Sequence, residues 1–223
     1  MTSRPGNLKA SSWRTPPAPY AFSLYRNMRI GLLGGTFNPP HSGHLHLSHM
    51  AYRELQLDCI WWLVTPQNPL KCRTHTPSMA TRMQAARKIT ANTPYIVVSD
   101  LEQALGTEKT FDFLEKLAPA FGLNKFVWIG GEDLMHHFHC WYHWQKIAAR
   151  LRLAFAPRHL PPGVSGRSVF TLRYGSRQVH RPSQLLSAPL PAWTILKGPV
   201  LPLSSTNLRQ KGKFADTPEY PLE

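Results

Sequence analysis

The chain has 223 residues, which suits one domain with small appendages, and its apolar content of 42% is enough for a core. No run of eighteen apolar residues marks a membrane span, and the first residues lack the apolar stretch of a secretory signal. The formal charge is +14, and residues 134–215 contain twelve Lys or Arg and no Asp or Glu. Such a field attracts anions such as nucleotides or nucleic acid, although charge alone favours a generally basic surface.

The cysteines exclude two further classes of protein. Cys59, Cys72 and Cys140 are odd in number and far apart in the sequence. This argues against a disulfide framework and against a zinc ribbon, and it fits a reducing environment. We therefore expect a cytoplasmic protein.

Composition divides the chain into three parts. Residues 1–27 are rich in Pro and Ser and contain no acidic residue, which is typical of a flexible N-terminal arm. An organised domain is expected over residues 28–215, and residues 216–223 are expected to form a C-terminal tail.

Strands and helices are predicted to alternate within this domain. Short apolar runs predict strands, and apolar residues at helical spacing predict helices, one of them capped by Ser78. Residues 158–192 are broken by Pro and Gly and are predicted to be loop. The predicted strands are 28–35, 59–66, 95–100, 125–131, 152–157 and 192–198, and the predicted helices are 43–56, 78–92, 110–121, 141–151 and 204–212.

This alternation predicts an α/β fold: a Rossmann-like, doubly wound, mainly parallel sheet with helices on both faces. Ligands of such sheets bind beyond the carboxyl ends of the strands. The turn after the first predicted strand, in "LLGGTFNPPHSGHLHLSHM" (32–50), lies at such an end. It is therefore the first candidate for a binding site.

The residue types of this turn suit a phosphate group. Gly34 and Gly35 allow close approach of the backbone, and His41 and His44 stand at the start of the next helix. Free N–H groups and the helix dipole favour an anion there. Metal binding by His41, His44, His46 and His49 is the alternative, but phosphate chemistry usually brings Mg²⁺ on its own oxygens.

The segment "GGTFNPPHSGH" resembles the signature of nucleotidyltransferases that carry a His-x-Gly-His or Thr-x-Gly-His motif, and its "FNPPH" version most resembles the bacterial nicotinate-nucleotide adenylyltransferases. Further segments resemble the same family in the expected order and together cover about residues 28–212. They are "PQNPLK" (66–71), "SDLE" (99–102), "KTFDFL" (109–114), "WIGGEDLMHHFHCWYHWQKI" (128–147) and "LSSTNLR" (203–209).

The resemblance implies transfer of AMP from ATP to nicotinate mononucleotide, which gives deamido-NAD and pyrophosphate. The attacking phosphate is already largely dianionic at neutral pH, so no general base is required. The enzyme must instead hold two anions in line and stabilise the departing pyrophosphate. Mg²⁺ is expected as a cofactor that ATP carries, with no metal ligand from the protein.

The resemblance also assigns a role to each matched residue. The catalytic residues are His41, His44 and Arg209, and His44 is the most important of them. The ATP-binding residues are Gly34, Gly35, Thr36, Phe37, Gly43, Gly131, Asp133, Ser204, Ser205 and Thr206. The mononucleotide-binding residues are Asn38, Lys71, Thr110, Trp141, whose ring would stack on the pyridine, and Tyr142, whose backbone would bind the carboxylate.

Some residues carry weaker or opposing signals. Lys71 is explained equally well as a contact to a substrate phosphate or as a solvated loop lysine. Arg158 is a weaker candidate for binding the adenosine part of ATP. Trp144 is expected in the helix core, and His136, His137 and His143 are expected on the surface of a helix. His139 stands where the resembled family often has a histidine. The family usually has Thr where Phe113 stands and a polar residue where Leu134 stands. The loss of a hydroxyl at 113 weakens the prediction of an acid rather than an amide acceptor.

Two alternatives to this function stay open. The first is the same chemistry on nicotinamide mononucleotide or on another phosphorylated acceptor. The second is a basic nucleic-acid-binding protein that uses the region after residue 134. The favoured interpretation expects no stable nucleic-acid partner, no membrane, and a possible homo-oligomer.

Overall fold

The computed structural model describes residues 24–66, 76–157 and 167–199, together with Ser205 and Leu208. Within them, six strands form one sheet in the order β3-β2-β1-β4-β5-β6, and every paired strand is parallel to its neighbour. The strands are β1 (Ile30–Gly35), β2 (Cys59–Val64), β3 (Ile96–Ser99), β4 (Phe126–Gly131), β5 (Arg152–Ala156) and β6 (Trp193–Ile195).

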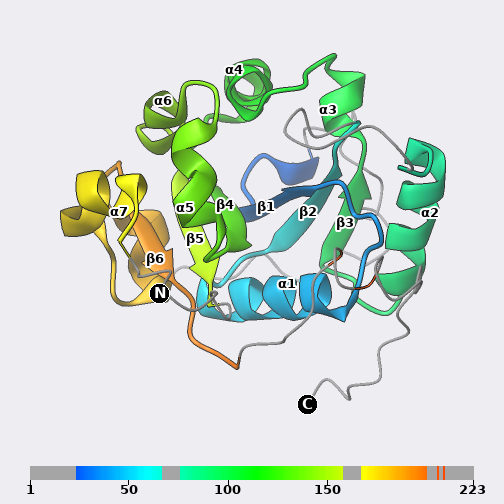
Figure 1. The fold of residues 1–223 in the computed structure, drawn as a ribbon, viewed down its shortest axis with the longest axis horizontal. Coiled ribbons are helices and arrows are strands. Elements are labelled where there is room, and N and C mark those ends of the chain that lie inside the picture. Colours follow the sequence, from blue (N-terminus) through cyan, green and yellow to red (C-terminus); the bar gives the residue numbers. More distant parts are fainter. Residues whose placement is uncertain (1–23, 67–75, 158–166, 200–204, 206–207, 209–223) are drawn as a thin grey trace.

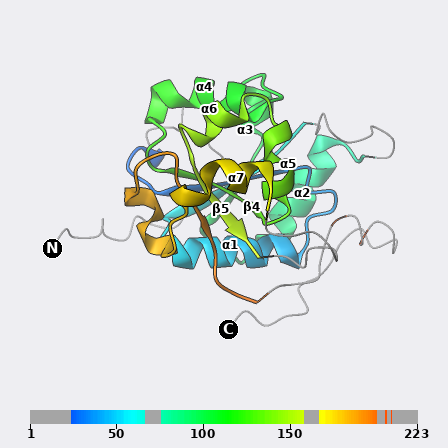
Figure 2. The ribbon, with the colours of Figure 1, turned by 60° about the vertical axis from the view of Figure 1, so that its left-hand side comes forward.

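Helices cover both faces of the sheet (Figures 1 and 2), so the predicted doubly wound α/β fold is confirmed. In Figure 2 the strands separate α1 from α4 and α6. The helices are α1 (Ser42–Glu54), α2 (Met79–Ile89), α3 (Leu101–Ala104), α4 (Thr110–Phe121), α5 (Leu134–His137), α6 (Trp144–Ala148) and α7 (Val169–Tyr174), with 3-10 turns η2 (Phe138–Cys140), η3 (Gly175–Arg177) and η4 (Pro182–Ser187).

The core consists of two apolar clusters, one on each face of the sheet. Successive side chains of a strand point to opposite faces, so the adjacent Trp61 and Trp62 of β2 belong to different clusters. The cluster of Trp61 contains residues of α3 to α7, whereas the cluster of Trp62 contains residues of α1, α2 and η4. Both indoles are fully buried.

The order of the strands reverses between β1 and β4. β1 lies between β2 and β4, and the chain leaves it toward α1 on one face, whereas it leaves β4 toward α5 on the other. A crevice forms at such a switch point, beyond the carboxyl ends of the two strands. Gly35 and Gly131 end these strands, so the turn singled out in the sequence lies beside the switch point.

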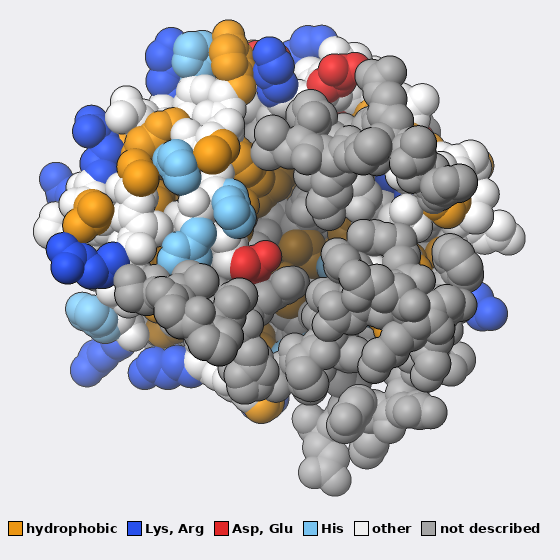
Figure 3. All heavy atoms as spheres, viewed as in Figure 1, with side chains coloured by type: hydrophobic (Ala, Val, Ile, Leu, Met, Phe, Trp, Pro, Cys, Tyr) orange, Lys and Arg blue, Asp and Glu red, His pale blue; other side chains and the backbone are white. Residues whose placement is uncertain are grey.

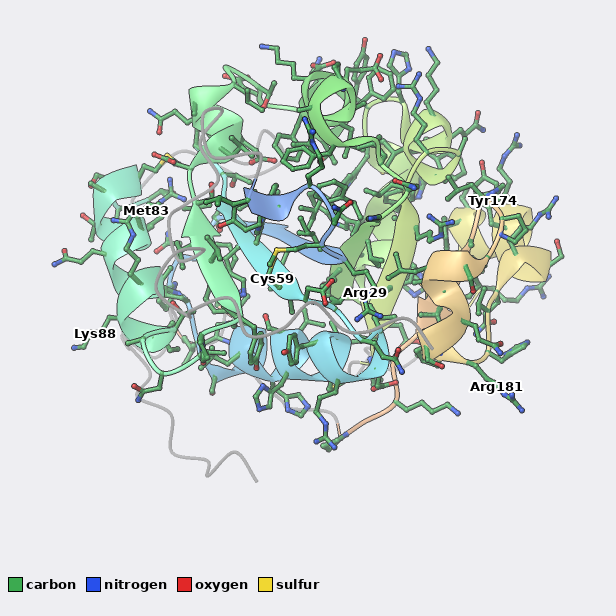
Figure 4. The ribbon with its side chains drawn as sticks, turned by 180° about the vertical axis from the view of Figure 1, so that it is seen from behind. Arg29, Cys59, Met83, Lys88, Tyr174 and Arg181 are labelled. Atoms are coloured by element: carbon green, nitrogen blue, oxygen red, sulfur yellow. The ribbon has the colours of Figure 1, made fainter. Side chains whose placement is uncertain are left out.

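The opposite, amino end of the sheet has no such turn. There the Asp58 carboxylate accepts from the backbone N–H of Arg29 at 2.7 Å and pairs with its guanidinium at 3.3 Å. Figure 4 shows Arg29 and Cys59 near the starts of β1 and β2. This pair fastens two central strands together away from the candidate site.

Three details differ from the expected elements. The helix predicted over 141–151 begins only at Trp144, because His143 has a left-handed φ of 53°. The segment predicted as loop over 158–192 contains α7, η3 and η4, and Ser168 caps α7 by accepting from the Thr171 N–H at 3.1 Å. The short helices α3 and α5 were not predicted.

Packed structure also begins earlier than Met28. Tyr25 is fully buried and meets the Trp61 ring edge-on at 5.1 Å, although it falls in the segment expected to be an arm. Residues 1–23 of that segment and the expected tail 216–223 lie outside the described residues. Among the described residues, no helix is long and apolar enough to span a bilayer.

Candidate active site

The turn after β1 is folded around a buried aromatic ring. Phe37 has a φ of 47° and is almost fully buried. Its ring stacks on Trp62 at 4.8 Å and lies 4.9 Å from the His44 ring. The following Asn38 is also buried. Phe37 therefore anchors the turn in the core and forms a wall beside His44.

The two glycines that end β1 have different neighbours. A Cβ on Gly34 would lie 2.8 Å from two ring atoms of Trp128, a β4 residue that is itself buried. A Cβ on Gly35 would meet nothing closer than the Phe37 ring, at 3.7 Å. Gly34 thus admits the indole of the neighbouring strand, whereas a methyl group at Gly35 would make only ordinary contacts with Phe37.

His41 and His44 form a pair at the start of α1. His41 is the N-cap and is 1% exposed, and His44 is the third helical residue. The His41 backbone N–H donates to Nδ1 of His44 at 3.2 Å, and the ring centroids are 3.9 Å apart. Because Nδ1 accepts, a neutral His44 ring carries its hydrogen on Nε2. The His44 ring thus offers an N–H donor.

A buried polar chain fixes α1 to the sheet one turn after His44. The Ser48 hydroxyl donates to the His44 carbonyl at 2.8 Å and accepts from the Trp62 indole N–H at 2.8 Å. Ser48 is fully buried. Since Trp62 also stacks on Phe37, the same indole supports both the turn and the helix.

The closing motif of the sequence reaches this turn. The Ser205 hydroxyl donates to the Pro39 carbonyl at 3.0 Å, across 166 positions of the chain. The segment leading toward it lies on α1, where both Glu54 carboxylate oxygens accept from the Lys197 N–H at 2.8–2.9 Å and His46 Nε2 donates to the Pro199 carbonyl at 2.9 Å. The structure thus joins two segments that the resemblance assigned to the ATP phosphates.

The residues expected at the pyridine also come together. Thr110 begins α4, and its neighbours Lys109 and Phe111 both contact Tyr142: the Lys109 ammonium lies 4.2 Å above that ring. Trp141 meets the edge of Trp128 at 5.4 Å. Trp128 is therefore a bridge between Trp141 and Gly34.

The β4 end supplies Gly131 and Asp133. Gly131 is buried at the end of the strand, whereas Asp133 is exposed and precedes α5. The two departures from the family pattern are both packed: Phe113 is fully buried in the core, and Leu134 fills the space beside Gly130. Trp144 packs against the core through Phe138, as expected.

Five of the expected site residues lie outside the described residues: Lys71, Arg158, Ser204, Thr206 and Arg209. The described part of the family pattern is therefore the first turn, residues 99–102, the start of α4, residues 128–147 and Ser205.

The histidines do not form a metal centre within the described ranges. No group of three or more His, Cys, Asp or Glu there could hold a metal ion. His46 donates to the Pro199 carbonyl, and His49 is hydrogen-bonded through Nδ1 to the Tyr95 hydroxyl. Burial and the nearby charges of Arg53 and His46 lower the pKa of His49. Figure 3 shows other histidines gathered near α5.

Three supporting residues were missed in the sequence: Ser48, Trp62 and Trp128. Each contacts a residue of the candidate site: Ser48 the His44 carbonyl, Trp62 the rings of Phe37 and His44, and Trp128 the ring of Trp141. The sequence did contain a signal for Trp62. Trp61 and Trp62 are adjacent in a predicted strand, so their indoles lie on opposite faces of the sheet and each must pack against the layer that covers its face. Nothing in the sequence marks Ser48 as buried.

Comparison with known proteins identifies relatives along most of the chain. A family profile described as cytidylyltransferase-like matches residues 32–211. "Probable nicotinate-nucleotide adenylyltransferase" from Bradyrhizobium sp. is 42% identical over 189 residues, which cover 82% of this chain and 95% of the relative. The protein of the same name from Cereibacter sphaeroides is 38% identical over 187 residues, covering 84% of this chain and 100% of the relative.

A solved structure shares the fold. Plasmodium falciparum nicotinic acid mononucleotide adenylyltransferase, complexed with NaAD, superposes with a TM-score of 0.59 at 18% identity, over 81% of this chain and 82% of that one. The chain therefore belongs to the cytidylyltransferase-like family of nucleotidyltransferases, as a member of its nicotinate-nucleotide adenylyltransferase group.

Proposed function

We propose that this protein transfers AMP from ATP to nicotinate mononucleotide and releases deamido-NAD and pyrophosphate, a step of NAD synthesis. The observation that carries the proposal is the contact of Ser205 with Pro39, beside the His41–His44 pair and the sheet's switch point. The names of the relatives at 38–42% identity support the choice of acceptor.

The reaction forms one P–O bond and breaks another. A phosphate oxygen of the mononucleotide attacks the α-phosphorus of ATP, and the bond to the bridging oxygen of pyrophosphate breaks. The attacking phosphate is largely dianionic at pH 7, so no proton has to be removed first. Catalysis then depends on positioning and on stabilising negative charge.

The described turn suits this task. His44 offers its Nε2–H to a phosphate oxygen, while Nδ1 accepts from the His41 backbone and so fixes the ring. Such donors, held before substrate arrives, stabilise charge without reorganising. The N-terminus of α1 adds a favourable dipole for an anion.

The acceptor's ring is proposed to bind near α4. Trp141 would stack on the pyridine, and Thr110 with the Tyr142 backbone would hold its carboxylate. The Lys109 ammonium above Tyr142 adds positive charge on this side, which favours an acid over an amide. Phe113, buried in the core, supplies no hydroxyl here.

Mg²⁺ is proposed to arrive with ATP. The first turn presents imidazole and N–H donors, which suit phosphate, whereas Mg²⁺ prefers several oxygen ligands in octahedral geometry. When bound to ATP, the ion would neutralise phosphate charge and thereby favour the approach of the second anion. A cytoplasmic location belongs to the same proposal and is supported by the free thiols of Cys59 and Cys140.

One experiment tests the proposed function directly. The protein is incubated with ATP, Mg²⁺ and either nicotinate or nicotinamide mononucleotide, and pyrophosphate release is followed. Faster turnover of the acid supports the proposal, equal or faster turnover of the amide supports the alternative acceptor, and no release with either rejects adenylyl transfer. Steeply salt-dependent binding of a DNA duplex would then favour the nucleic-acid-binding alternative.

His44→Ala tests the role of the turn. We expect kcat to fall by about 10²–10³-fold, the range seen when one preorganised charge-stabilising donor is removed, while the circular dichroism spectrum stays unchanged. His180→Ala, at an exposed position far along the chain, is the control and should keep full activity. Wild-type turnover by His44→Ala would contradict the assignment.

A further inference from the structure

The second helix places a buried cation behind the first turn. Arg82 of α2 is 3% exposed. Its guanidinium donates to four backbone carbonyls: Thr36 at 2.7 Å, Thr65 at 2.8 Å, Pro66 at 3.0 Å and Pro77 at 3.1 Å. Burial lowers the pKa of Arg82, yet an arginine keeps its charge at neutral pH.

These carbonyls belong to three segments of the chain: the turn after β1 (Thr36), the chain after β2 (Thr65 and Pro66) and the residue before the cap of α2 (Pro77). The β1–β2 ladder ends with the Thr65 N–H donating to the Gly35 carbonyl at 2.9 Å. Just beyond it, Nη1 of Arg82 bridges the Thr36 and Thr65 carbonyls. A planar fork of donors can satisfy several converging carbonyls at once, which a single hydrogen bond of the ladder cannot. Arg82 thus joins the two segments that leave β1 and β2, just beyond the last hydrogen bond between these strands.

The bond to Thr36 also orients the next residue. The Thr36–Phe37 peptide is trans, so its N–H points away from the side of the carbonyl that Arg82 holds. Phe37, with its left-handed φ, follows at once, and its ring lies against His44. A short path of contacts therefore connects Arg82 to the His44 imidazole.

We propose that Arg82 is the positioning residue of the phosphate-binding turn: through the Thr36 carbonyl it sets the place of Phe37 and, with it, of His44. The inference rests on the proposed adenylyl transfer for its kinetic consequences, but its structural part does not. Arg82 touches neither substrate in this proposal. Its guanidinium holds four backbone carbonyls in place by hydrogen bonds.

The chain offers a matched control in Arg152. That residue is also buried, at 8% exposure, and its guanidinium donates to the Asn124 and Ala188 carbonyls at 2.8–3.2 Å. It starts β5, so it lies at the amino end of the sheet, away from the first turn. Arg152→Gln should lower stability as Arg82→Gln does, without disturbing His44.

The experiment compares Arg82→Gln with Arg152→Gln below their melting temperatures. We expect Arg82→Gln to lower kcat/KM for ATP by about 10–100-fold, as when a residue that orients a ligand-binding group is lost, and Arg152→Gln to stay within about twofold of wild type. Equal losses in both variants, or none in Arg82→Gln, would overturn the proposal. If Arg82→Gln does not fold, Arg82→Lys is measured in its place with the same criteria.

A second readout does not depend on activity. Long-range ¹H–¹⁵N spectra of the ligand-free protein report the two ring nitrogens of His44. Arg82→Gln should shift these signals, and Arg152→Gln should leave them in place. Unshifted signals in Arg82→Gln reject the positioning role, whereas shifted signals in a protein without adenylyl transfer reject only the proposed function.

Discussion

At the scale of single residues, the turn after β1 combines ligand chemistry with ordinary packing needs. The pair of glycines shows the difference. Gly34 makes room for the Trp128 indole, whereas a side-chain carbon at Gly35 would meet only the Phe37 residue, at an ordinary contact distance of 3.7 Å. A sequence alone assigns both glycines to the ligand, because it does not say which strand lies beside β1.

This difference is measurable as stability. In Gly34→Ala the new methyl group would lie 2.8 Å from a rigid, buried indole, so we expect a loss of about 1–3 kcal/mol in the free energy of unfolding. Gly35→Ala, with neighbours at 3.7 Å or more, should be close to neutral. Chemical denaturation of both variants checks this, and a Gly34→Ala as stable as wild type would contradict it.

At the scale of elements, α1 is positioned by more than one neighbour. The predicted helix 43–56 is confirmed with bounds Ser42–Glu54. Leu45 and Leu55 are buried, and the partly buried Tyr52 packs against the same apolar cluster and stacks on Tyr95 at 3.9 Å. His46 of the same helix contacts the Pro199 carbonyl. Because several neighbours pack on α1, helical periodicity alone does not reveal its buried faces.

Ser48→Ala tests how firmly α1 must be held. The change leaves the buried Trp62 indole N–H without its acceptor, so we expect a loss of about 1–3 kcal/mol in the free energy of unfolding. We also expect kcat to fall, because the His44 carbonyl loses the same hydroxyl.

The control for this change is Ser187→Ala, which removes an exposed hydroxyl that donates to the Gln184 carbonyl at 2.9 Å. It should alter neither stability nor turnover. The role assigned to the Ser48–Trp62 bond is wrong if the two variants melt at the same temperature as each other. Thermal melts and steady-state kinetics provide both measurements.

At the scale of the whole molecule, the three-layer arrangement buries some charged groups. Glu102 of α3 is 5% exposed, and desolvation raises the pKa of its carboxyl to about 7. A carboxyl with a raised pKa in the folded state keeps its proton there while the unfolded chain releases it. The contribution of Glu102 to the free energy of unfolding is therefore most favourable below about pH 4.5 and falls as the pH rises from about 4.5 to about 7.

Glu102→Gln removes this dependence. With a folded-state pKa of about 7 against an ordinary value of 4.5, the ionised carboxyl costs about 3 kcal/mol at pH 8 and little at pH 5. We expect the variant to gain stability over wild type by that order at pH 8 and to match it at pH 5. Urea denaturation at the two pH values checks this, and a pH-independent difference would contradict the assignment.

The sequence by itself determined the order and type of most elements and the residues of the first turn. Both depend on local signals: the period of apolar residues, the glycines and prolines that end a strand, and histidines three positions apart. Such signals involve residues that are close together in the chain, so they can be recognised before the fold is known. The late helix α7, hidden among prolines and glycines, shows where they fail.

Only the tertiary structure decided what holds the site together. Trp128 against Gly34, Arg82 across the ends of β1 and β2, and Ser205 on Pro39 each join residues far apart in sequence. Such contacts depend on the order of strands in the sheet and on which face each helix covers, and long-range packing fixes both. A buried arginine and an exposed one look the same in a sequence until that packing is known.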